Sequence, residues 1–129
     1  MSRFSADPRD QATPAALVDL LAALEAGRLL DPGHTARLRE MLRATRTGPA
    51  QLRAGLPANL VLAHKTGQIA SGGFTAALND VGIVSGNGRR IAIAVFLTDV
   101  DAPLERCQAI TADVARVVWS ELGSAVLAR

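Results

Sequence analysis

The chain has 129 residues, of which 49% are hydrophobic and 20% are charged, and its formal net charge is +2. This length is typical of a single domain with its own core, here residues 1–129, and the composition excludes a disordered chain. The small net charge, the lack of tyrosine and the one tryptophan disfavour a nucleic-acid partner. One cysteine excludes an internal disulfide, and two distant histidines predict no metal site; no sequence motif indicates a cofactor.

The start of the chain lacks the apolar stretch of a signal peptide, and no run reaches the roughly 18 apolar residues of a membrane span. As it stands, the sequence predicts a cytoplasmic protein without a membrane partner.

Two helices are predicted first in the chain. Thr13 is the expected N-cap of the first, with Pro14 at the first helical position, and Gly27 ends it. Asp31 repeats this pattern for a second helix that runs through Thr45. Their apolar stripes are Leu17, Leu20, Leu21 and Leu24, then Leu38, Met41 and Leu42.

A sheet and a last helix are predicted for the remainder. After a helical turn at 48–53, we expect strands at 60–66, 74–84 and 91–98, a loop at 67–73 and a tight turn at 86–88. The short connections favour an antiparallel meander. The last helix starts after Pro103, with a predicted core stripe of Leu104, Cys107, Ile110, Val114, Val117, Val118 and Leu122. The fold class is therefore α+β: two to three helices, a three-stranded antiparallel sheet within residues 60–98, and a long C-terminal helix.

Lys65 is the only lysine among the 14 lysine and arginine residues of the chain. It precedes Thr66 and Gly67 after an apolar run. An ammonium is a compact point charge that fits a tight polar site, whereas a guanidinium is a broad planar fork. The K-T-G triplet is one of three motifs of penicillin-recognising serine enzymes. The alternative is an ordinary solvated strand end.

The order of features resembles the C-terminal half of a class A β-lactamase over essentially the whole chain. The matching segments are residues 7–15, like the end of the omega loop and the next helix; 56–67, like the run into the active-site strand; 79–84, like the next strand; and 90–104, like the last strand and terminal helix.

The resemblance implies a β-lactam, or a peptidoglycan-like small molecule, as a weakly bound ligand. Lys65 would supply positive charge near the substrate carboxylate, and Thr66 would donate a hydrogen bond to it. Gly67 would let the backbone come close, because a Cβ would clash. The backbone N–H of Gln68 would be one of two oxyanion-hole donors.

The sequence also departs from the family pattern. None of its serines is followed by a lysine three residues later, no S-D-N triplet occurs, and no glutamate precedes Glu25. We therefore expect no β-lactam hydrolysis without a complementary N-terminal half. As to localisation, the resemblance implies export, because members of the family are exported proteins. The alternative is a truncated or relic protein without catalysis, which acts only as a self-associating or complementing partner.

Several other polar residues have two interpretations. His64 is interpreted as a strand-end side chain rather than a base, because no nucleophile adjoins it. Asp7, Arg9 and Asp10 form either an ion network that anchors a loop or an exposed turn. Asn79 and Asp80 are interpreted as polar loop scaffolding, and Cys107 and Trp119 as packing residues of the last helix.

The strand at 91–98 is expected to expose an unpaired edge, because its family counterpart pairs with strands of the N-terminal half. Part of the last helix's apolar stripe would be exposed for the same reason. Unpaired edges recruit other strands. We therefore expect a complementary half or a homo-oligomer as the protein partner.

Overall fold

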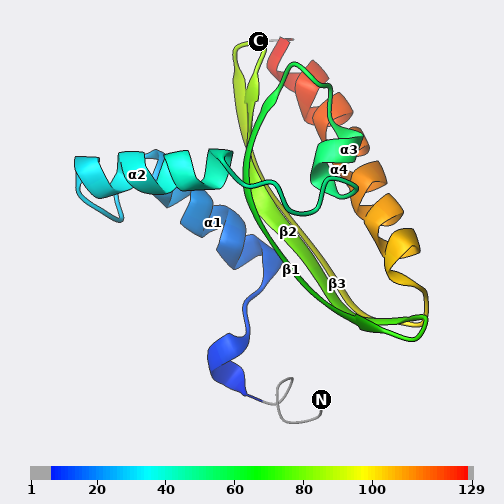
Figure 1. Ribbon diagram of the computed structural model, residues 1–129. Helices are drawn as coiled ribbons and strands as arrows, with labels where there is room; N and C mark the ends of the chain where they lie inside the picture. The colour runs from blue at the N-terminus through cyan, green and yellow to red at the C-terminus, as the bar shows by residue number, and fades with distance from the viewer. Residues whose placement is uncertain (1–6, 128–129) are drawn as a thin grey trace.

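The computed structural model describes residues 7–127 and confirms the α+β fold class (Figure 1). Before the sheet come a 3-10 turn η1 (Pro8–Asp10) and helices α1 (Pro14–Glu25), α2 (Pro32–Arg43) and α3 (Leu52–Gly55). The strands are β1 (Val61–Ser71), β2 (Phe74–Gly86) and β3 (Arg89–Val100), and helix α4 (Leu104–Leu127) follows them.

Side-chain caps determine where the first two helices begin, as predicted. The hydroxyl of Thr13 accepts a hydrogen bond from the N–H of Ala16, and the carboxylate of Asp31 accepts one from the N–H of His34. The backbone hydrogen bond from His34, followed by that residue's side chain, lowers the pKa of Asp31 below its usual range. Each helix has proline in its first turn, where a missing N–H costs nothing.

The sheet is an antiparallel meander in the order β1-β2-β3. The predicted loop at 67–73 is wrong, because β1 continues to Ser71 and only two residues turn the chain. Gly72 and Gly73 both have positive φ, which allows this tight hairpin. The pairing of β1 with β2 consequently continues through Gly67, which lies opposite Asn79, to Ser71.

Helices lie on both faces of the sheet (Figure 1). Helices α1 and α2 lie on one side, and α3 and α4 pack against the other. The main core lies between the sheet and α3/α4, and contains Leu52, Leu56, Leu60, Leu62, Val84, Ile93, Val95 and Ala115. This core fixes the position of β1 relative to the loop that joins α2 to α3.

The apolar face of α4 is only partly the predicted one. Cys107 is buried, but Ile110, Val114, Val117 and Leu122 are exposed, and Val117 is 59% exposed. The buried face of α4 is instead formed by small residues such as Ala112 and Ala115. At this face α3 comes very close, since a Cβ on Gly55 would lie only 1.8 Å from the carbonyl oxygen of Ala112. So close an approach of α3 to α4 favours small side chains. The stripes of α1 and α2 are also narrower than predicted, with Leu20 and Met41 exposed.

No helix within residues 7–127 is both long and apolar enough to cross a membrane.

Candidate functional site

The K-T-G triplet lies on an edge strand. β1 pairs with β2 on one side only. Side chains alternate between the faces of a strand, so Lys65 and Thr66 point to opposite faces. Lys65 is exposed, and its ammonium donates a hydrogen bond to the carbonyl of Thr66. The triplet thus presents its charge and its hydroxyl on either side of one accessible edge.

Two threonines from the loop after α2 fasten this edge. The hydroxyl of Thr45 donates to the carbonyl of His64 at 2.7 Å. The hydroxyl of Thr47 lies 2.7 Å from that of Thr66. Thr47 therefore fixes the direction of the Thr66 hydroxyl, a contact that the sequence pattern did not indicate.

The backbone groups of alternate β1 residues point outward from the sheet. The His64 carbonyl must face the free edge, because its partner Thr45 belongs to the loop and not to β2. In an antiparallel strand the N–H and C=O of one residue point the same way, and the direction repeats every second residue. Thr66 and Gln68 therefore direct their N–H groups to the free edge. The only irregularity in the β1–β2 register comes later, between Ile69 and Ala70.

Gln51 is a polar residue of this site that sequence reasoning missed. It is completely buried, and neither its side-chain nitrogen nor its oxygen has a hydrogen-bond partner. A Cβ on Gly48 would lie 2.1 Å from its Oε1 and 2.7 Å from the Cγ2 of Thr66. Gly48 has a φ of +63° and leaves room for both side chains. An unpaired buried amide of this kind is costly to the fold.

His64 and Asp80 form a buried pair under the strand. The His64 Nδ1 lies 2.8 Å from Asp80 Oδ1, and the N–H of Leu52 donates to the other carboxylate oxygen at 3.2 Å. Their side chains are 5% and 0% exposed. The interpretations of His64 as a strand-end side chain and of Asp80 as loop scaffolding are therefore wrong. Both lie within strands, and the carboxylate joins β1 and β2 to α3.

The glycine of the triplet has open space beside it. A Cβ on Gly67 would meet nothing within 4 Å, whereas one on Gly82 would lie 2.5 Å from the carbonyl oxygen of Ala63. The fold therefore requires glycine at 82 but leaves the choice at 67 open.

The remaining candidates lie apart from this edge. Arg9 donates to the carboxylate of Asp7 within an exposed turn, and this side-chain hydrogen bond is the main cause that lowers the pKa of Asp7. Asp10 belongs to the same turn, but its side chain lies outside the described residues. Cys107 is buried and Trp119 packs against the core, which confirms both as packing residues.

An α+β unit with K-T-G on its edge strand defines the class of serine β-lactamase-type proteins. The model of the β-lactamase enzyme family matches residues 1–122. The chain therefore belongs to this family.

Its relatives with known names are class A β-lactamases. The chain is 34% identical over 113 residues to β-lactamase VEB-1 of Pseudomonas aeruginosa, covering 84% of this chain and 38% of that protein. It is 40% identical over 118 residues to β-lactamase AST-1 of Nocardia asteroides, covering 91% and 37%.

Solved structures give the same result. The TLA-1 extended-spectrum β-lactamase superposes with a TM-score of 0.82 at 36% identity, over 86% of this chain and 41% of that one. A β-lactamase from Chitinophaga pinensis gives 0.82 at 33% identity, over 94% and 47%. The chain thus spans about two fifths of the length of the relatives that it matches.

Proposed function

We propose that this β-lactamase-type segment forms the K-T-G wall of a β-lactam-binding site. One observation carries the proposal: the triplet lies on a free edge strand. Lys65 and Gln68 are exposed there, and the half-buried Thr66 has its hydroxyl held 2.7 Å from that of Thr47. Thr66 would donate a hydrogen bond to the ligand's carboxylate, and Lys65 would supply positive charge near it. The N–H of Gln68 would donate to the developing oxyanion. Such donors are worth about 3–4 kcal/mol in the transition state.

A polypeptide of these 129 residues would bind but not hydrolyse. It contains no serine with a lysine three residues later. Without a nucleophile no acyl-enzyme can form. Purified protein should therefore give no nitrocefin turnover and no penicilloyl adduct by intact-protein mass spectrometry; a stable adduct would refute this part.

Binding is tested separately by titrating benzylpenicillin into ¹⁵N-labelled protein. We expect millimolar affinity, near 4 kcal/mol, with shifts at the amides of Thr66, Gly67 and Gln68. Lys65→Ala should remove these shifts, whereas Arg37→Ala, which deletes an exposed charge on α2, should not. Shifts that persist in Lys65→Ala would exclude the assignment.

A second candidate function is that of a complementing or self-associating partner. The observation that favours it is the exposed apolar row on α4, formed by Ile110, Val114 and Val117, together with the unpaired outer edge of β3. A row of this kind is typical of an interface. Co-expression with the N-terminal half of a class A β-lactamase should then restore nitrocefin turnover.

A further inference from the structure

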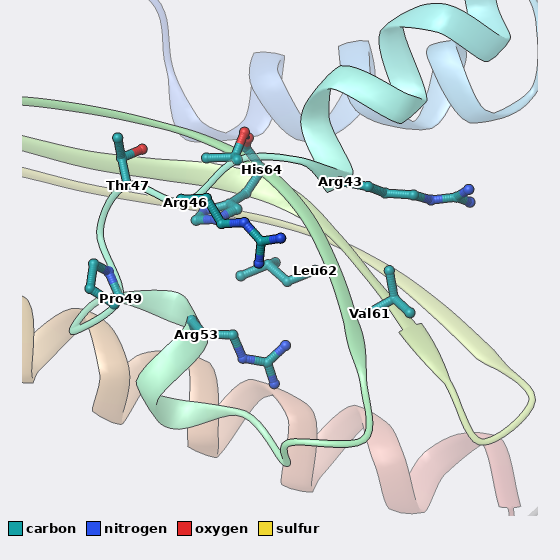
Figure 2. Close-up of a pocket in the computed structure, with 9 residues that line it drawn as sticks. Arg43, Arg46, Thr47, Pro49, Arg53, Val61, Leu62 and His64 are labelled. Atoms are coloured by element: carbon teal, nitrogen blue, oxygen red, sulfur yellow. The ribbon is translucent and has the colours of Figure 1, made fainter.

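A basic cavity lies beside the first half of β1, next to the K-T-G edge. It has a volume of about 340 Å³ and lies between the end of α2, α3 and the strand (Figure 2). Pockets for small ligands usually start at about 300 Å³. Arg43, Arg46 and Arg53 line it together with Leu62 and His64, and none of its nine lining residues is acidic.

Two of the guanidinium groups extend into the same space. Figure 2 shows the guanidinium group of Arg46 beside Leu62 and that of Arg53 below it, extending from α3, while Arg43 extends outward at the rim. Arg53 is held in place, because it donates to the carbonyls of Leu60 at 2.8 Å, Leu56 at 3.4 Å and Pro57. Neutral carbonyls orient this guanidinium but do not neutralise its charge.

Within residues 7–127, none of the three arginines of this cavity forms an ion pair. Some arginines elsewhere do have such partners: Arg39 and Arg90 both contact the carboxylate of Glu25, at 3.0 and 2.9 Å. The cavity is thus a concave site with converging positive charge.

We infer that this cavity binds a small oxyanion, a phosphate or carboxylate group, held between Arg46 and Arg53. A planar guanidinium such as that of Arg46 matches both groups with two parallel hydrogen bonds. Arg53, which already donates to three carbonyls, adds positive charge and its remaining N–H groups. The site goes beyond the proposed β-lactam site, because neither Lys65 nor Gln68 lines it. The same chemistry could come from a free anion or from an acidic side chain of another polypeptide.

The test is an NMR titration of the ¹⁵N-labelled chain at constant ionic strength, with inorganic phosphate, citrate and a hexaglutamate peptide as probes. We expect saturable shifts at the amides of residues 45–47 and Leu62, without a shift at Gln68. Arg46→Gln should weaken binding by about fivefold or more, because it removes one charge-assisted contact. Arg37→Gln, an exposed arginine on α2 outside the cavity, is the matched control and should bind as the unmodified chain does.

Each outcome decides the proposal. Saturation with phosphate or citrate supports a free anion, and saturation with hexaglutamate alone supports a carboxylate from a polypeptide. The inference is overturned if no probe saturates, if the shifts lie elsewhere, or if both arginine variants weaken binding equally. Because the shift map of the unmodified chain locates the site by itself, misfolding of a variant would not leave the question open.

Discussion

Gly67 and Gly82 lie in neighbouring strands but in different surroundings. A Cβ on Gly82 would lie 2.5 Å from the oxygen of Ala63 and 2.6 Å from the Cβ of His64. Gly67 has nothing within 4 Å. If a ligand rather than the fold requires glycine at 67, alanine at 67 should impair ligand binding, whereas alanine at 82 should lower the stability of the fold.

Gly67→Ala should leave the free energy of unfolding unchanged or raise it by up to about 1 kcal/mol, because glycine weakens a strand. It should also reduce the benzylpenicillin-induced shifts. Gly82→Ala should lower stability by about 1–3 kcal/mol through overpacking. Urea unfolding measures both, and equal destabilisation at the two positions would contradict the distinction.

The buried carboxylate of Asp80 should be important for stability. Asp80→Ala leaves His64 Nδ1 and the N–H of Leu52 without their partner. Each orphaned buried group costs about 1–3 kcal/mol. The exposed pair of Asp113 with Arg116 gives the control, since Asp113→Ala should cost no more than about 1 kcal/mol. Equal effects in urea unfolding would show that the Asp80 pair is no stronger than a surface pair.

At the scale of elements, the sequence predicted what local signals encode. Thr13 and Asp31 cap helices with their own side chains, and the strands and their order follow from short apolar runs and glycine turns. The K-T-G edge was also predictable, because the triplet follows such a run.

What the sequence did not reveal depends on contacts between distant residues. Asp80 meets His64 across 16 residues and Leu52 across 28, so neither partner could be read from local spacing. The burial of Gln51 likewise depends on the packing of β1 against the loop that follows α2, because Gly48 of that loop adjoins both Gln51 and Thr66. The burial of α4 was mispredicted because the close approach of α3 selects small residues over large ones.

The outer edge of β3 is a second element-level feature that should affect association. Its residues pair with β2 alone, and unpaired edges recruit other strands. Ala94→Lys places a charge on this strand and should shift association toward monomer. Ala36→Lys, on the exposed surface of α2, adds the same charge elsewhere and should not. Sedimentation velocity measures the fraction of monomer for both variants. An unchanged monomer fraction for Ala94→Lys would exclude edge pairing.

At the scale of the molecule, we expect the chain to associate through the exposed row on α4. Val114→Gln with Val117→Gln should raise the monomer fraction without loss of stability, because both side chains already face solvent. Leu29→Gln changes an apolar residue away from this row whose exposure, 45%, lies between those of Val114 and Val117, and serves as the control. Light scattering that shows a folded monomer at every concentration of the unmodified chain would contradict the expectation.

The meander has a kinetic consequence. Every strand pairs with its neighbour in sequence, and the hairpin beyond the K-T-G strand closes through Gly72 and Gly73 alone. Hairpins of this kind form in about 1–10 μs, much faster than pairings between distant segments. The edge that carries Lys65 can therefore be ordered early, as part of the sheet, before any second polypeptide docks. A second polypeptide that binds later would therefore dock on an edge strand that has already folded.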